Sequence, residues 1–278
     1  MIDSFLYIFS LCLMRGIAMQ LSEVIDHLEQ LSPPSYAESW DNVGLLAGRK
    51  DKEVQRVFIA LDATDEVVDE AIRRDADLLL THHPLIFKGI KKVSDEDFIG
   101  RRIVRLLRYD VSYFAMHTNF DVMGMADAAA DEMELERRDV LDVTFEDDIS
   151  REGIGRIGNL PGTMTLKECA GFVKKCFHIG SVRVYGDLNK KIHRVAICPG
   201  SGKSVIGKAL DKKVDVLITG DIDHHEGIDA VSQGLPIIDA SHYGLEKIFI
   251  PYMRDYLHRE FPSLEVMCAE FKAPYFDI

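Results

Sequence analysis

The stretch VFIALDATDEVVDEAIRRDADLLLTHHP, residues 57–84, decides the fold class. It begins with the apolar run 57–63, continues with a charged segment at 66–74 and ends in the apolar run 76–82. A continuous apolar run is typical of a parallel strand that helices cover on both faces. The spacing of apolar residues in the charged segment predicts a short helix. The stretch therefore predicts a strand–helix–strand unit.

The strand–helix–strand pattern continues along the chain and later returns. A helix at 100–109 and a strand at 111–117 are expected next. The segment 194–223, RVAICPGSGKSVIGKALDKKVDVLITGDID, aligns element by element with residues 57–84 at nearly the same spacing. A strand at 235–241 closes this second series. We therefore expect two related, intertwined α/β lobes with mixed, largely parallel sheets covered by helices.

The two lobes are expected to meet near residue 125. The first α/β lobe covers 19–125 and the second α/β lobe covers 126–235. Within the second lobe, the segment ADEMELERRD at 130–139 predicts a charged, exposed helix. Thr165 with Glu168 three residues later predicts a capping box at the start of another helix.

Residues 1–18 form an N-terminal extension of a different character. Its apolar run from Phe5 to Met14 is far shorter than the ~20 residues that span a bilayer. Asp3 stands where a secretory signal carries positive charge, and no small-residue cleavage site follows. We therefore expect Met19 to be the natural start and the protein to be cytoplasmic, with no membrane partner.

The composition narrows the class of protein. Apolar residues make up 47% and charged residues 28%, which is typical of a globular protein with a buried core. The net charge of −13 argues against nucleic acid as a partner. A local basic cluster is expected to be a solvated face; it comprises Lys88, Lys91, Lys92, Arg101 and Arg102. The five cysteines have no pairwise spacing typical of disulfides, so we expect buried thiols in a reducing compartment.

Histidines gather where predicted strands end. Of the ten histidines, those at or just beyond a strand end are His82, His83, His117, His224, His225 and His242. In parallel α/β sheets the carboxyl ends of strands carry the functional loops. The alternative is that these histidines are ordinary hydrogen-bonded residues at strand ends, and the sequence leaves it open. The repetition at several strand ends favours a metal site.

Carboxylates accompany two of these histidines. Asp121 follows His117 by four residues, and Glu246 follows His242 at the same spacing, which places the second pair on one face of a helical turn. An imidazole and a carboxylate arranged in this way can reach one metal ion. Nitrogen and oxygen donors without cysteine favour Zn, Fe, Mn, Co or Ni over a structural thiolate zinc site.

The adjacent pair His82 and His83 points to more than one ion. Successive side chains of an extended chain point to opposite sides, so one ion cannot easily use both imidazoles. Two neighbouring ions could take one each, with Asp121 or Glu246 as a bridge. Two-metal hydrolytic sites hold their ions ~3.5–4 Å apart.

The segment CPGSGKSVIG, 198–207, is similar to a phosphate-binding loop but lacks its pattern. In the P-loop pattern four residues separate the first glycine from the Gly-Lys pair, so Gly202–Lys203 would require glycine at position 197, which is isoleucine. A tight strand-to-helix turn explains the glycines, so we interpret the segment as a turn.

Six motifs resemble a known family in order and spacing. They are AESWDNVGLLAG (37–48), LLLTHHPLIF (78–87), MHTNFD (116–121), ICPGSGKS (197–204), ITGDIDHH (218–225) and ASHYGLEKIF (240–249). Together they resemble the GTP cyclohydrolase 1 type 2 homologs, also called NIF-three-like dinuclear-metal-centre hexameric proteins. The resemblance runs from about Met19 to the C-terminus.

The resemblance implies a metal site, a returning C-terminal segment and an assembly. Two divalent metal ions per chain are implied, and their ligands would be His82, His83, Asp121, His242 and Glu246. His117 would lie beside them, either as a catalytic proton carrier or as a group that contacts the ligands without binding the metal. The segment 236–278 would pack back on the first lobe, and the protein would be a homo-oligomer, a toroidal hexamer. The family's usual glycine before the last histidine is Ser241 here, a change that we expect to leave the metal undisturbed.

Two functions follow from these observations. The first is a metal-dependent hydrolase that acts on a nucleotide or related small-molecule substrate, with GTP ring opening as the reaction the family name implies. The alternative is a non-enzymatic metal-binding, regulatory or scaffold protein that forms a toroidal hexamer. An open coordination position with bound water and a nearby proton carrier would favour the first function. A saturated site without an accessible pocket, or a metal that exchanges freely, would favour the second.

Overall fold

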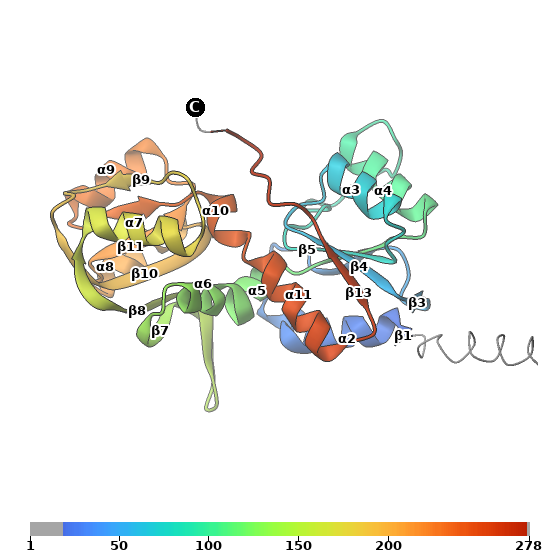
Figure 1. The fold of residues 1–278 in the computed structure, drawn as a ribbon, viewed down its shortest axis with the longest axis horizontal. Coiled ribbons are helices and arrows are strands. Elements are labelled where there is room, and N and C mark those ends of the chain that lie inside the picture. Colours follow the sequence, from blue (N-terminus) through green and yellow to red (C-terminus); the bar gives the residue numbers. More distant parts are fainter. Residues whose placement is uncertain (1–18, 277–278) are drawn as a thin grey trace, which may run out of the picture. The chain divides into compact units, whose positions relative to one another are not determined.

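The computed structural model describes residues 19–276, which form two compact units (Figure 1). Unit 1 contains residues 19–30, 42–116 and 253–269; the intervening segments and residues 270–276 form unit 2. The predicted extension 1–18 lies outside the described residues. Unit 2 already includes the chain from residue 117, and the boundary between the lobes at residue 125 stays a prediction.

Unit 1 is built on a five-stranded sheet. Its order is β13 (Glu265–Cys268), β4 (Arg56–Ala60), β5 (Leu78–Thr81), β6 (Ser112–Ala115) and β2 (Gly44–Ala47). The first four strands are parallel, and β2 pairs with β6 antiparallel. A short antiparallel pair, β1 (Met19–Gln20) with β3 (Glu53–Val54), stands apart from this sheet. Unit 1 contains the helices α2 (Leu21–Leu31), α3 (Asp65–Arg73) and α4 (Phe98–Arg108). Most of α11 (Phe249–Glu260) also belongs to this unit.

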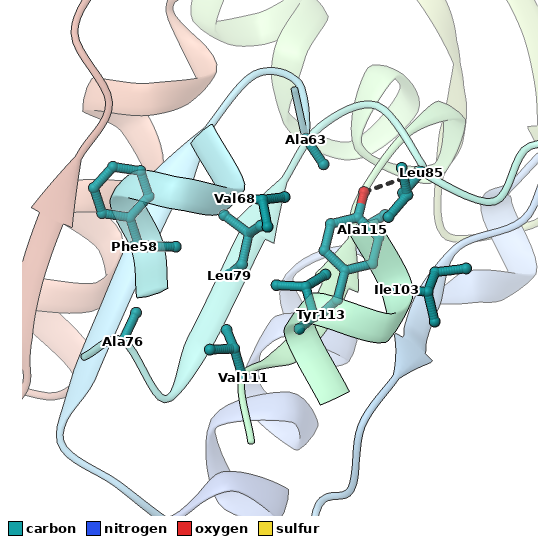
Figure 2. Packing of buried hydrophobic residues seen from close by; sticks show 12 residues of the cluster. Phe58, Ala63, Val68, Ala76, Leu79, Leu85, Ile103, Val111, Tyr113 and Ala115 are labelled. Atoms are coloured by element: carbon teal, nitrogen blue, oxygen red, sulfur yellow. Dashed lines mark hydrogen bonds between the residues drawn. The ribbon is translucent and has the colours of Figure 1, made fainter. Parts of the chain in front are cut away.

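The core of unit 1 lies between the sheet and helices α3 and α4. Phe58, Leu79 and Tyr113 of the strands pack with Val68 of α3 and Ile103 of α4, as Figure 2 shows. Both helices begin at side-chain caps, since Thr64 accepts from Val67 N and Asp97 accepts from Gly100 N. The predicted strand–helix–strand unit is therefore present, with apolar strands buried as expected.

Unit 2 is built on a six-stranded sheet. Its order is β7 (Glu136–Glu146), β8 (Arg151–Thr165), β10 (Lys191–Ser201), β11 (Val216–Gly220), β12 (Ile237–Asp239) and β9 (Arg183–Tyr185). Strands β10, β11 and β12 are parallel, and the remaining pairs are antiparallel. The helices are η1 (Pro34–Tyr36), α5 (Thr118–Phe120), η2 (Asp121–Met125), α6 (Ala126–Glu132), α7 (Leu166–Cys176), η3 (Lys203–Val205), α8 (Ile206–Asp211), α9 (His224–Ser232) and α10 (His242–Glu246). The mixed sheets and covering helices confirm the α/β fold class.

The predicted helix at 130–139 is wrong. Helix α6 ends at Glu132, and β7 begins at Glu136 and pairs antiparallel with β8. The turn of this hairpin is fixed by Asp147, whose side chain accepts from Ile149 N and Ser150 N. Cross-strand pairing has overridden the helix propensity of the charged residues. The capping box of Thr165 and Glu168 is present at the start of α7.

No helix within residues 19–276 combines the length and the apolar character needed to cross a membrane.

Candidate metal centre

His82 directly follows β5 in unit 1 and is fully buried. Its Nδ1 lies 2.7 Å from the carbonyl oxygen of Met116. A carbonyl oxygen only accepts, so Nδ1 carries a proton and donates it to this bond. A neutral imidazole that donates from one nitrogen to an oxygen and offers the other is the usual form of a metal-binding histidine.

His83 repeats this arrangement with a carboxylate. Its Nδ1 lies 2.7 Å from Oδ1 of Asp62, which stands just beyond β4. The imidazole rings of His82 and His83 have centroids 4.9 Å apart. A carboxylate on Nδ1 orients the ring and makes Nε2 a better donor to a metal.

The turn after His83 is held by the buried hydroxyl of Tyr113. This hydroxyl accepts from Leu85 N at 2.8 Å, a bond drawn in Figure 2, and donates to the carbonyl oxygen of His83 at 2.8 Å. Thr81 Oγ1 donates to the same carbonyl at 2.9 Å. Burial raises the pKa of the Tyr113 phenol, so it stays a neutral donor. The backbone of His83 is thus fixed from the core of unit 1.

Replacing Tyr113 by phenylalanine is expected to lower the free energy of unfolding by about 1–3 kcal/mol, because Leu85 N is left without its acceptor in the core. The same change is expected to weaken metal binding, since the backbone of His83 is no longer fixed. Thermal melting and metal titration of the variant check both effects. Tyr109→Phe is the control, because the Tyr109 side chain is largely exposed. Equal behaviour of the two variants would contradict this role of Tyr113.

In unit 2, His242 and Glu246 form an arrangement of the same kind within helix α10. Nε2 of His242 lies 2.9 Å from Oε2 of Glu246, and Nδ1 lies 2.7 Å from Oδ2 of Asp221, which follows β11. The Glu246 side chain is buried. The spacing of four residues therefore places an imidazole nitrogen and a carboxylate oxygen beside each other.

Asp121, the first residue of η2, lies in the same neighbourhood of unit 2 as Glu246. Burial raises the pKa of the Cys198 thiol, and the charges of Asp121 and Glu246 raise it further. Gly200 lies against Glu246 as well: a Cβ on Gly200 would collide with Oε1 of Glu246 and lie 3.9 Å from Cε1 of His242. The end of β10 thus passes close to these side chains only because it carries glycine.

Ser241 precedes His242 in a backbone conformation that favours glycine. Its φ is 61° and its ψ 151°, a region that side chains with a Cβ rarely adopt. Its Oγ accepts from Gly244 N at 2.9 Å and caps α10. The structure thus gives the physical reason for a glycine at this position, and the serine adds a cap at the cost of backbone strain.

Opposite effects are expected from two substitutions of Ser241. Glycine relieves backbone strain of about 1–3 kcal/mol, and its weaker capping costs only about a few tenths of a kcal/mol. Glycine also raises the entropy of the unfolded chain, which offsets part of this gain in stability. Alanine keeps the strain and loses the cap, which costs about 0.5–2 kcal/mol. We expect Ser241→Gly to be at least as stable as the parent and Ser241→Ala less stable in denaturant unfolding. If Ser241→Gly were less stable than Ser241→Ala, the backbone of Ser241 would not be strained.

His117 stands at the start of α5 and is paired with Asp41. Nδ1 of His117 lies 2.9 Å from Oδ1 of Asp41, whose other oxygen accepts from Thr118 N at 3.0 Å. Burial by itself raises the pKa of Asp41, but hydrogen bonds from His117 and Thr118 outweigh it and hold the pKa well below its usual range. Asp41 is thus a carboxylate that orients the imidazole of His117.

The two remaining strand-end histidines have different surroundings. His224 and His225 are exposed in the first turn of α9, with ring centroids 5.3 Å apart. Asp223 caps this helix through Glu226 N. Within residues 19–276 neither belongs to the groups of side chains that could hold a metal ion.

The glycine-rich segment after β10 is a packing turn. A Cβ on Gly202 would collide with Oγ1 of Thr219, and Lys203 pairs with Glu226 and, at 3.8 Å, with Asp223. The glycines therefore serve close packing, and the lysine is part of a surface ion-pair group.

Replacing Lys203 by alanine is expected to leave metal content, any hydrolysis and the melting temperature nearly unchanged, because an exposed ion pair contributes little. Elemental analysis, a turnover assay and thermal melting check this. A large loss of nucleotide binding would instead show that the segment is a phosphate loop.

Sequence reasoning missed the three carboxylates that orient the imidazoles: Asp41, Asp62 and Asp221. A signal was present for two of them. Asp62 and Asp221 each follow an apolar strand, at corresponding places in IALD and ITGD. An acidic residue directly after a buried strand is placed to meet side chains from the next strand end.

These features define an α/β protein with groups of histidine and acidic side chains that could hold a metal ion. The Duf34/NIF3 (NGG1p interacting factor 3) family profile matches residues 19–274, and the chain belongs to this family.

Relatives and a solved structure agree with this assignment. A Streptococcus pneumoniae protein named GTP cyclohydrolase 1 type 2 homolog is 38% identical over 238 residues, 84% of this chain and 88% of that protein. A Clostridium acetobutylicum protein of the same name is 34% identical over 232 residues, 83% of this chain and 86% of that protein. The crystal structure of a Staphylococcus aureus hypothetical protein matches with a TM-score of 0.84 and 32% identity, covering 94% of this chain and all of that one.

Proposed function

We propose that the chain is a hydrolase that uses two divalent metal ions and acts on a nucleotide or related small molecule. The proposed ligands are His82, His83, Asp121, His242 and Glu246. One observation carries this proposal: each of the three imidazoles has its Nδ1 bound to an oxygen, at 2.7 Å in every case. This common arrangement leaves Nε2 as the metal-binding nitrogen of each ring, and in His242 that nitrogen lies 2.9 Å from Oε2 of Glu246, which is proposed as a ligand too.

The donor set fits a metal with nitrogen and oxygen ligands. Cys198 lies near Asp121 and Glu246, but burial raises the pKa of its thiol, which disfavours the thiolate that binds metals. Zn, Fe, Mn, Co and Ni all accept imidazole and carboxylate donors. When bound, two such ions lower the pKa of a coordinated water toward ~7 and polarise the bond that is attacked.

The proposed catalytic residue of the chain is His117. Asp41 holds its Nδ1, so Nε2 is the nitrogen that can take up or release a proton. The low pKa of Asp41 keeps this carboxylate charged, which stabilises the imidazole when it is protonated. In this role His117 moves a proton between water and the leaving group.

The names of related proteins support a nucleotide as the proposed substrate. Proteins named GTP cyclohydrolase 1 type 2 homolog cover more than four fifths of this chain. Opening of the guanine ring of GTP by hydrolysis, with release of an N-formyl group, is the corresponding reaction. Other phosphoester, amide or C–N hydrolyses use the same donor set and belong in the test.

The test combines elemental analysis with turnover. Metal per chain is measured on the purified protein, and GTP and a panel of phosphoesters are assayed in the same samples. Two ions per chain with turnover of any of these compounds support the proposal. Two ions without turnover would favour the non-enzymatic metal-binding alternative, and absence of metal after loading would refute the site.

The toroidal homohexamer stays a prediction from the family resemblance. Sedimentation equilibrium of the purified chain checks it, and a mass of six chains is expected.

A further inference from the structure

Unit 2 contains a cavity of about 960 Å³ beside helix α10. It is lined by the segment after α7, by the ends of β11 and β12, by α10 and by residues of the C-terminal segment. A volume of this size is at the upper end of the roughly 300–1,000 Å³ of small-molecule sites. Asp221, which orients His242, is part of the wall.

Three aromatic side chains line the cavity: Tyr243, Phe271 and Tyr275. Phe271 is 60% exposed and Tyr275 43% exposed, although both are large apolar side chains. Aromatic faces in a concave site are typical of surfaces that stack against flat rings. This wall therefore favours a ligand with a planar ring.

Two cationic side chains line the same cavity. Nζ of Lys247 donates to the carbonyl oxygen of His178 at 3.0 Å and lies 5.9 Å from the ring centroid of Phe271. The ammonium is thus placed beside the aromatic wall. The guanidinium of Arg183 lies 3.8 Å from Oδ2 of Asp239.

The acidic residues of the wall have hydrogen bonds of their own. Asp239 accepts from Ser241 N at 3.0 Å and from Ile222 N at 3.3 Å, and Asp221 accepts from His242 at 2.7 Å. Their negative charges are thus stabilised by donors within unit 2. The wall therefore carries two cations and two carboxylates, and the place for an anion is at Lys247, whose ammonium lies beside the ring of Phe271.

We infer that this cavity binds a molecule that combines a flat ring with an anionic group. Phe271 and Tyr275 contact the ring, and Lys247 and Arg183 contact the anion. The role of the cavity as the substrate pocket rests on the proposed function, because Asp221 joins its wall to the candidate metal ligand His242. The binding itself does not require turnover.

The test measures binding by calorimetry on the full chain as purified. The probes are guanosine 5′-monophosphate, guanosine and inorganic phosphate. We expect the monophosphate to bind at least about tenfold more tightly than either of the other probes. Lys247→Met is expected to weaken binding of the monophosphate about tenfold and to change binding of guanosine little. Phe271→Ala is expected to weaken binding of both compounds. Lys91→Met, an exposed lysine of unit 1, is the control and is expected to bind like the parent.

Several results would overturn the inference. Unchanged monophosphate binding in Lys247→Met and Phe271→Ala would show that the ligand binds elsewhere. If inorganic phosphate bound as tightly as the monophosphate, the flat ring would not contribute to binding. Absence of binding by all three probes would overturn it as well. Because binding is measured directly, a protein without turnover that shows the expected pattern refutes the hydrolase and supports the cavity.

Discussion

Replacing His242 by alanine is expected to abolish binding of at least one metal ion per chain without unfolding the protein. In the folded chain its imidazole bonds to Asp221 at Nδ1 and lies beside Glu246 at Nε2, so the variant removes a donor from the proposed site. The side chain is one third exposed, so little packing is lost. Elemental analysis gives the metal content, and circular dichroism with thermal melting shows that the fold is retained.

His193→Ala is the matched control for this variant. His193 is an exposed residue of β10 in the same unit, and its backbone N donates to Asp215. The control is expected to keep the full metal content. If His242→Ala keeps it as well, the ligand assignment is wrong. Loss of metal in His83→Ala would support His83 as a ligand as well.

Replacing Gly200 by alanine is expected to lower both metal content and stability. Its φ of 76° is unfavourable for alanine, and the added Cβ would collide with Oε1 of Glu246. Because the Glu246 side chain is buried, it cannot turn away into solvent. We expect a loss of about 1–3 kcal/mol in the free energy of unfolding and displacement of the carboxylate.

The control for Gly200→Ala is the same change at Gly207 in helix α8. A Cβ on Gly207 meets no atom within 4 Å, so alanine is expected to stabilise the helix by up to about 1 kcal/mol and to leave the metal content intact. Melting temperature and metal content of the two variants are measured side by side. A Gly200→Ala protein with the metal content of the parent would show that the close approach to Glu246 is not needed.

The parallel strands of both units could be predicted from sequence because their side chains are buried on both faces. Runs such as LLLT in β5 and VLIT in β11 are continuous and apolar for that reason. The hairpin of β7 and β8 could not be recognised in the same way. Strand β7 is charged and largely exposed, and β8 is rich in glycine, so neither has the apolar signal of a covered strand.

The candidate site was predictable where residue type and strand end coincide. His82 and His83 directly follow β5, and His242 opens α10 after β12. The hydrogen bond from His82 to a carbonyl oxygen could not be predicted from the sequence, because every residue has a backbone carbonyl and residue type does not show which one accepts. It also does not show the backbone of Ser241, whose left-handed φ depends on how β12 is joined to α10.

Strand β13 has a consequence for the order in which the chain is made. It pairs in parallel with β4, although some two hundred residues separate the two strands in the sequence. During synthesis on the ribosome, unit 1 therefore waits for its last edge strand until nearly the whole chain has emerged, whereas the sheet of unit 2 is complete once β12 is made. Until then β4 presents an open edge, which is the kind of surface that chaperones protect from pairing with other chains.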